Sequence, residues 1–113
     1  MSVRAATEAD IQRVILHYLG LRGVLATRVN SGAIKTGDRF FRLNSSPGCS
    51  DILCCYRGAY IALEVKRPGK KATPKQEGFL AAVRKAGGIG AVVTSVGDVE
   101  RILDDVDAGA DVC

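Results

Sequence analysis

Asp51, Glu64 and Lys66 are the residues whose types and spacing best fit a site for metal-assisted hydrolysis. Two carboxylates held about 5 Å apart repel each other, and a hard divalent cation is the usual remedy. A protonated lysine does not bind a cation, but it can hold a nucleophilic water or stabilise charge on a phosphate. The alternative is an ordinary cross-strand ion pair on a solvated face, in which Lys66 neutralises one acid.

Two neighbouring strands would bring these residues together. The segments 51–56 and 59–66 have the composition of strands, and Arg57-Gly58 between them can form a two-residue hairpin turn. In that register the two acidic residues pair directly across the strands. The lysine then lies beside the glutamate, because residues two apart share one face, and the apolar residues between them point to the other.

Three further features favour the metal site over the ion pair. Glu8 lies near the apolar stripe of an expected first helix and can reach inward, although an acid that complements the helix dipole explains it equally well. Gln76 shares the buried face of an expected second helix with Phe79 and Leu80, where a satisfied polar residue at the core edge is the alternative. Four basic residues follow Lys66 beside the start of that helix: Arg67, Lys70, Lys71 and Lys75. The alternative is that they are simply charged residues on a solvated surface.

The remaining pattern predicts one mixed α/β domain. Thr7 is the expected N-cap of a helix that stops at Gly20 and Gly23, and Thr73-Pro74 begins a helix that runs to about residue 86. We expect strands at 24–30, 39–43, 51–56, 59–66 and 89–94, a hairpin loop at 31–38, and a last helix from 95 to about 106. The expected order of elements is α-β-β-β-β-α-β-α.

The body of the chain is strongly basic. Of 113 residues, sixteen are Lys or Arg and twelve are Asp or Glu, and four of the acidic residues fall within 104–113. Such a balance favours a partner that carries phosphate, such as nucleic acid. No apolar run is long enough to span a membrane, so we expect no membrane partner.

The cysteines and the N-terminus indicate a reducing compartment. Cys49, Cys54, Cys55 and Cys113 have no CxxC spacing, and the single histidine, His17, is far from them in sequence, which disfavours zinc. The N-terminus has no apolar core of a signal peptide. We therefore expect one cytoplasmic domain over 1–113, with an acidic tail at 104–113 that has no assigned task.

Four strings of residues form a more specific combination than any one of them: Gly48-Cys49-Ser50-Asp51-Ile52-Leu53, Ala62-Leu63-Glu64-Val65-Lys66-Arg67-Pro68-Gly69-Lys70, Thr73-Pro74-Lys75-Gln76 and Ala86-Gly87-Gly88. Together they resemble the virus-type replication-repair nuclease (VRR-NUC) family, a branch of the PD-(D/E)XK nuclease superfamily. The resemblance covers about residues 8–103. It departs at Ser50, where the family often has Pro; because Asp51 is retained, we expect little effect on activity.

The resemblance implies a restriction-endonuclease-like core, in which a mixed sheet is flanked by helices. It implies Mg²⁺ or Mn²⁺ as the cofactor, with no organic cofactor. Lys66 would position the attacking water, and Gln76 matches a helix glutamine that the family places near the site. The implied metal ligands are the carboxylates of Asp51 and Glu64, the backbone carbonyl of Val65 and, from the first helix, the catalytic acid Glu8.

Stand-alone family members, including small phage proteins, look similar to Holliday junction resolvases. The resemblance therefore implies a structure-specific endonuclease on branched DNA, a homodimer with a role in DNA repair. The alternatives are a nuclease on flaps, nicked duplex or single strands, and a non-catalytic basic nucleic-acid-binding module whose acidic pair is structural. The residues expected to contact DNA are Arg28, Asn30, Lys35, Arg39, Arg42, Ser50, Arg67, Lys70, Lys71 and Lys75.

Overall fold

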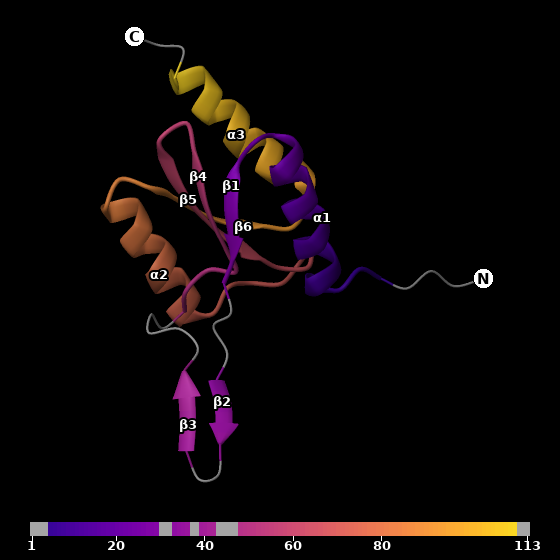
Figure 1. Cartoon of the computed structure of the whole chain (residues 1–113), viewed down its shortest axis with the longest axis vertical. Coiled ribbons are helices and arrows are strands. Elements are labelled where there is room, and N and C mark those ends of the chain that lie inside the picture. The colour runs from indigo at the N-terminus through magenta and orange to yellow at the C-terminus, as the bar shows by residue number, and fades with distance from the viewer. Residues whose placement is uncertain (1–4, 30–32, 37–38, 43–47, 111–113) are drawn as a thin grey trace, which may run out of the picture.

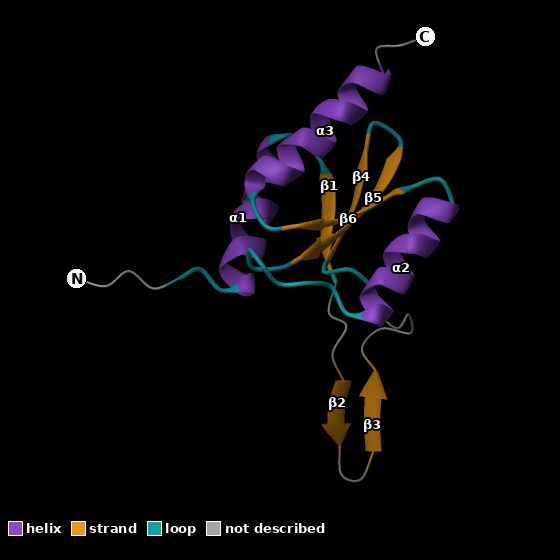
Figure 2. Cartoon of the chain, turned by 180° about the vertical axis from the view of Figure 1, so that it is seen from behind, coloured by secondary structure: helices purple, strands orange, loops and turns teal. Residues whose placement is uncertain are grey.

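A computed structural model describes residues 5–29, 33–36, 39–42 and 48–110; for 33–36, 39–42 and 110 it describes the backbone alone. The elements are α1 (Glu8–Leu21), β1 (Leu25–Arg28), β2 (Ala33–Thr36), β3 (Arg39–Arg42), β4 (Ile52–Tyr56), β5 (Ala59–Val65), α2 (Pro74–Lys85), β6 (Ile89–Val93) and α3 (Val96–Ala110). Strands β1, β4, β5 and β6 form one sheet in that order. Helices α1 and α3 cover one face and α2 lies on the other (Figures 1 and 2). The expected mixed sheet flanked by helices is confirmed.

The strand register matches the register expected from the two-residue turn. β4 and β5 are antiparallel, with Ile52 opposite Leu63. The turn residues Arg57 and Gly58 both have positive φ, 51° and 83°, as a tight hairpin turn requires. β5 and β6 are parallel, and α2 connects them. The next position before Ile52 is Asp51, which this register places opposite Glu64.

The segment between β1 and β4 differs from the expectation. The expected loop at 31–38 contains strand β2, and β3 pairs with β2 in a separate two-stranded sheet instead of returning along β1. β1 pairs with β4 instead. The reason is local: Gly37-Asp38 is itself a two-residue hairpin signal, and it leaves Ala33–Thr36 free to pair with the strand that follows. The hairpin lies away from the four-stranded sheet (Figure 1).

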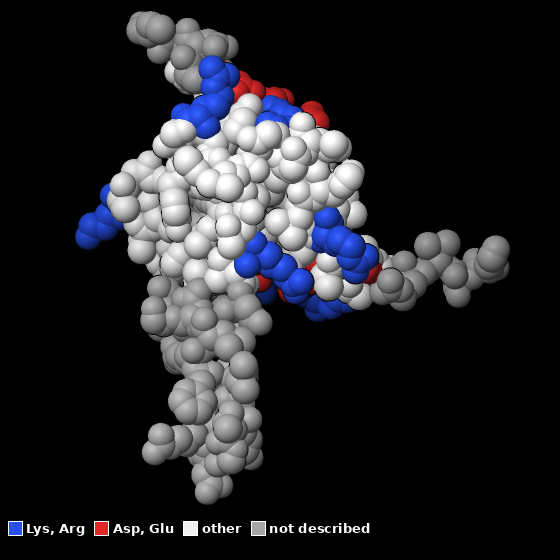
Figure 3. Space-filling view, in the orientation of Figure 1, with Lys and Arg blue, Asp and Glu red and all other residues white. Residues whose placement is uncertain are grey.

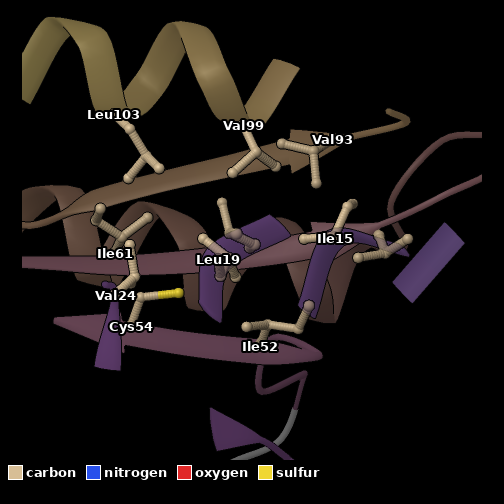
Figure 4. Packing of buried hydrophobic residues seen from close by; sticks show 11 residues of the cluster. Ile15, Leu19, Val24, Ile52, Cys54, Ile61, Val93, Val99 and Leu103 are labelled. Carbon is tan, nitrogen blue, oxygen red and sulfur yellow. The ribbon is translucent and has the colours of Figure 1, made fainter. Parts of the chain in front are cut away.

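The larger core lies between the sheet and the pair α1 and α3. Alternate residues of β5 point into it, and residues one helical turn apart in α1 and α3 face them. Each fully buried aliphatic side chain of this kind contributes about 1.5–3 kcal/mol. Its members include Ile15, Leu19, Ile52, Ile61, Leu63, Val65, Val93, Val99 and Leu103 (Figure 4).

The helix ends follow local sequence signals. Thr7 and Asp10 form a capping box at the start of α1, and Thr73 and Gln76 form the same box at the start of α2. α3 runs to Ala110, about one turn beyond the expected end. Within the described ranges, no helix is both long and apolar enough to cross a membrane.

Asp107, near the end of α3, ties this helix to the tip of the β4–β5 hairpin. Its Oδ1 accepts hydrogen bonds from the Tyr56 hydroxyl at 2.8 Å and from Arg57 Nη1 at 3.0 Å. Its Oδ2 accepts one from Arg22 Nη2 at 3.1 Å. The Tyr56 hydrogen bond, followed by that of Arg57, lowers the pKa of the Asp107 carboxyl. Residues that had no expected task therefore fasten α3 to the sheet.

Asp107→Asn is expected to lower the midpoint of thermal unfolding more at pH 7 than at pH 3. A carboxyl whose pKa is lowered by folding stabilises the protein above its unfolded-state pKa, near 4, and that contribution disappears as the pH falls through the folded-state value. Thermal melts of both proteins between pH 3 and pH 7 measure the difference. A gap that persists unchanged at pH 3 would contradict the assignment to ionised Asp107.

Candidate active site

Asp51 and Glu64 meet where β4 begins and β5 ends. The backbone of Asp51 is held by the residue that follows β1, since its carbonyl accepts from Val29 N at 2.7 Å. Its side chain is held by β5, since Oδ2 accepts from Val65 N at 2.8 Å. Glu64 is 1% exposed and points to the same face of the sheet as Ala62, toward α2. Two carboxylates are thus fixed against each other by the backbone of three strands.

Burial and like charge both act against ionisation of Glu64. Removal from water, and then the charge and hydrogen bonding of Asp51, raise the pKa of Glu64 to about 8; Lys66 opposes the rise and Glu8 adds to it. Lys66 Nζ lies 3.9 Å from Glu64 Oε1, too far for a hydrogen bond. Glu64 Oε2 is buried and has no hydrogen-bond partner among the residues that the structure describes. A buried carboxylate oxygen without a partner is costly unless a cation binds it.

Lys66 lies beside Glu64, as the spacing predicted. Its backbone N–H donates to Val93 O at 3.0 Å, which continues the β5–β6 pairing one residue past β5. The side chain is 12% exposed, so its ammonium group is held close to the carboxylates but is not sealed off from solvent. The arrangement places one cationic group at the open side of an acidic pair.

The donor set fits a hard divalent cation. In the described part of the chain, no three His, Cys, Asp or Glu side chains gather into a metal-binding group. Two carboxylates, Asp51 and Glu64, are instead available together, with one oxygen of Glu64 unpaired. Mg²⁺ typically uses one or two carboxylates and keeps several waters, whereas a structural zinc site needs four protein ligands. The pair therefore suits Mg²⁺ or Mn²⁺ better than zinc.

Glu8 lies close to this pair, whereas Gln76 is used at the start of α2. Glu8 is in the first turn of α1, near enough for its charge to raise the pKa of Glu64. Gln76 Oε1 accepts from Thr73 N at 2.8 Å, so its carbonyl is used in the capping box of α2. A catalytic role for either residue, and ligation by the Val65 carbonyl, stay predictions.

The residues expected to contact DNA fall into three groups. Ser50 is fully buried, so in this arrangement it does not reach a DNA backbone, and its Oγ has no hydrogen-bond partner. Asn30 lies outside the described residues, and only the backbone is described for Lys35, Arg39 and Arg42. The remaining residues are exposed: Arg28, Arg67, Lys70, Lys71 and Lys75.

Two exposed cations lie immediately past the site. Arg67 and Lys70 line a surface hollow with Pro68 and with Ala5 and Ala6, which precede α1. In Figure 3, basic side chains lie along the lower edge of the described part of the molecule. The surface next to the acidic pair can therefore attract phosphate.

Gly48 is a residue of the site that sequence reasoning missed. Its φ is +70°, and a Cβ built on it would lie 2.1 Å from Lys75 O and 2.8 Å from Gln76 N. The backbone three residues before Asp51 thus packs directly on the first turn of α2. Pro47-Gly48 signals a turn in the sequence, but it does not signal this contact.

The fold is shared with solved structures of VRR_NUC domains. One, described as a VRR_NUC domain, is 24% identical over 88% of this chain and 97% of its own, with a TM-score of 0.62. Another, described as a VRR_NUC domain protein, is 19% identical over 89% of this chain and 88% of its own, with a TM-score of 0.59. No protein-family model matches the chain, and no curated protein matches it either. The resemblance to VRR-NUC proteins is therefore confirmed at the level of the fold.

Proposed function

We propose that the chain is a metal-dependent nuclease that hydrolyses phosphodiester bonds of DNA. The observation that supports this most directly is the unpaired, buried oxygen of Glu64 opposite Asp51, beside the ammonium group of Lys66. The structural neighbours carry the name of a nuclease domain, which agrees with that chemistry.

Each side chain of the proposed site has a separate role in hydrolysis. Asp51 and Glu64 would hold Mg²⁺ or Mn²⁺, which would lower the pKa of a water and neutralise charge on the phosphate. Lys66 orients the attacking water and stabilises the negative charge that develops on the phosphate oxygens. Arg67 and Lys70, which are exposed and line one hollow beside the site, hold the DNA backbone.

Branched DNA, such as a Holliday junction, is the proposed substrate, and a homodimer in a cytoplasm is the proposed form of the protein. A four-way junction offers two symmetric cuts, and two copies of so small a domain would provide the surface to bind it. Cleavage rates on a panel of junction, flap, nicked duplex and single-stranded DNA distinguish branched DNA from the other nuclease substrates. Sedimentation with and without junction tests the dimer.

Lys66→Ala is expected to reduce cleavage about 100-fold or more, because it removes the cation that stabilises the developing charge. Cleavage of labelled junction with Mg²⁺ measures the effect. Lys85→Ala is the matched control: it is an exposed lysine in the last turn of α2, and its cleavage rate should stay within about twofold of the wild type. Equal cleavage by Lys66→Ala and wild type would remove Lys66 from the site.

Metal binding distinguishes the proposed nuclease from the alternative of a non-catalytic DNA-binding module. Calorimetry with Mn²⁺ should show binding to the wild type and to Lys66→Ala, but not to Asp51→Asn, because only the last change removes a ligand. Uptake that does not depend on Asp51 would favour the module, in which the acidic pair is structural.

A further inference from the structure

The hairpin of β2 and β3 is joined to the body of the protein beside the proposed active site. β1 ends at Arg28, and the next residue, Val29, donates its backbone N–H to Asp51 O at 2.7 Å. Ala33 begins β2 only four residues after Val29, so the base of the hairpin lies within about 14 Å of that hydrogen bond. Figures 1 and 2 both show β2 and β3 projecting away from the four-stranded sheet.

The register of the hairpin places one aromatic residue and at least one basic residue on each of its faces. Phe40 and Phe41 are neighbours in β3, so they lie on opposite faces. Residues that pair across the strands share a face, as do residues two apart in one strand. One face therefore holds Ile34, Thr36, Arg39 and Phe41, and the other holds Ala33, Lys35, Phe40 and Arg42.

This pattern differs from that of a hairpin that packs on a protein core. Such a hairpin has apolar residues on one face and polar residues on the other. Here the two faces are alike, and residues 33–42 contain three basic residues, one acidic residue and two of the three phenylalanines of the chain. A two-stranded hairpin is only marginally stable in water by itself. Burying both phenylalanines therefore requires a partner that contacts both faces at once, and the positive charge favours a polyanion.

An opened branch point of DNA is a partner of this kind. Inside a continuous duplex every base pair is stacked on both sides, whereas at an opened branch the last base pair of each arm has one free face. Two neighbouring arms thus present two free faces, with phosphates around them. Aromatic rings stack on bases, and Lys and Arg bind phosphates.

We propose that the β2–β3 hairpin is a wedge that enters a branch point, with Phe40 on the last base pair of one arm and Phe41 on that of the next. Apolar side chains of other DNA-binding proteins separate base pairs in the same way. The four residues of β2 span about 13 Å, more than the roughly 8.5 Å depth of a major groove, so the hairpin is long enough to reach base pairs.

The wedge also limits where the cut falls. This point rests on the proposed function, because the cut is made at Asp51. The reach from Val29 to the base of the hairpin and the length of the hairpin together place the branch within about eight nucleotides of the cut, at about 3.4 Å per nucleotide. Mapped cuts that lie further from the branch would contradict the wedge.

Photo-crosslinking of the cleavage-defective Lys66→Ala protein locates the hairpin on DNA. A four-way junction carries 5-iodouracil either in the base pair at the branch or at single positions up to ten base pairs along one arm. The peptide that contains Phe40 and Phe41 should crosslink most strongly at the branch. A maximum further along the arm, or crosslinks to other peptides alone, would overturn the proposal.

Phe40→Leu combined with Phe41→Leu keeps both positions apolar and removes the rings. The double variant should weaken binding to the junction about tenfold or more, and binding to blunt duplex much less, in EDTA to prevent cleavage. Val14→Thr changes a residue of α1 that is 56% exposed, and should leave both affinities unchanged. Equal weakening on junction and duplex would mean that the hairpin lies in a groove, and would overturn the wedge.

The basic residues of the hairpin should behave differently from the rings. Lys35→Gln combined with Arg42→Gln should weaken binding to junction and duplex alike and reduce its salt dependence, because phosphate contacts are the same in both. Sedimentation of the double leucine variant without DNA excludes a protein partner. A change in its oligomeric state would show that a second copy covers Phe40 and Phe41, and would overturn the proposal.

The wedge and the nuclease fail separately. If the wild type cleaves DNA but the hairpin does not crosslink at the branch, the wedge is wrong and the nuclease stands. If the hairpin crosslinks at the branch but no DNA is cut with Mg²⁺ or Mn²⁺, the hairpin stands as a branch-binding element and the nuclease is wrong.

Discussion

Replacing Glu64 by glutamine is expected to stabilise the protein in alkaline solution and to remove the proposed nuclease activity. Glutamine has nearly the same shape as glutamate but carries no charge to desolvate. The ionised carboxyl of Glu64 is unfavourable because it is 1% exposed and faces Asp51. The same change removes a proposed ligand of the metal, which should reduce cleavage about 1000-fold, or roughly 4 kcal/mol of barrier.

The pH dependence of the effect follows from the direction of the pKa shift. Folding raises the pKa of Glu64 from an ordinary value near 4.5 to about 8. Between these values the folded protein holds a proton that the unfolded chain has released, so the free energy of unfolding of the wild type falls as the pH rises. Above pH 8 the loss is complete, on the order of 3–5 kcal/mol. Glu64→Gln should lack this loss.

Urea unfolding of both proteins in EDTA, from pH 4 to pH 9, measures the difference. The two should be nearly equal at pH 4, and Glu64→Gln should be more stable by an amount that grows up to pH 8 and then stays constant. Asp107→Asn is an opposite control, because it should lose stability relative to the wild type above pH 4. A difference for Glu64→Gln that does not change with pH would show that folding does not shift the pKa of Glu64.

The parts of this site that the sequence predicts are those set by local rules. A two-residue turn at Arg57-Gly58 determines the pairing of β4 with β5, and this pairing alone places Asp51 opposite Glu64. Thr7 and Thr73 begin their helices because a side-chain oxygen caps them whatever the tertiary context. The register of one hairpin was therefore enough to predict the acidic pair.

The features that the sequence does not predict depend on which elements pack against each other in the fold. Ser50 belongs to a polar turn by composition, yet the fold buries it completely. Gln76 has the spacing of both a site residue and a capping residue, and the structure uses its carbonyl as a cap. α2 buries Ala62 on the same face as Glu64, which strand alternation alone cannot show.

Gly48→Ala is expected to be among the most destabilising single changes outside the core, with a loss of at least about 3 kcal/mol of unfolding free energy. Two costs combine. Alanine at a positive φ of +70° costs about 1–2 kcal/mol by itself. Its Cβ would also lie 2.1 Å from Lys75 O and 2.3 Å from Lys75 C. Both are backbone atoms of the first turn of α2, which cannot move aside as a side chain would, so overpacking adds a further penalty.

Gly23→Ala separates the two costs, because Gly23 has nearly the same φ, +71°, but nothing within 4 Å of its added Cβ. Urea unfolding should show a loss of about 1–2 kcal/mol for Gly23→Ala and a clearly larger one for Gly48→Ala. Gly48→Ala should also reduce cleavage in conditions where it remains folded, since relief of the clash moves α2 away from the segment that carries Asp51. Equal losses for the two variants would mean that this turn does not pack on α2 in solution. The position of Asp51 relative to the basic start of α2 would then be set by β1 and β5 alone.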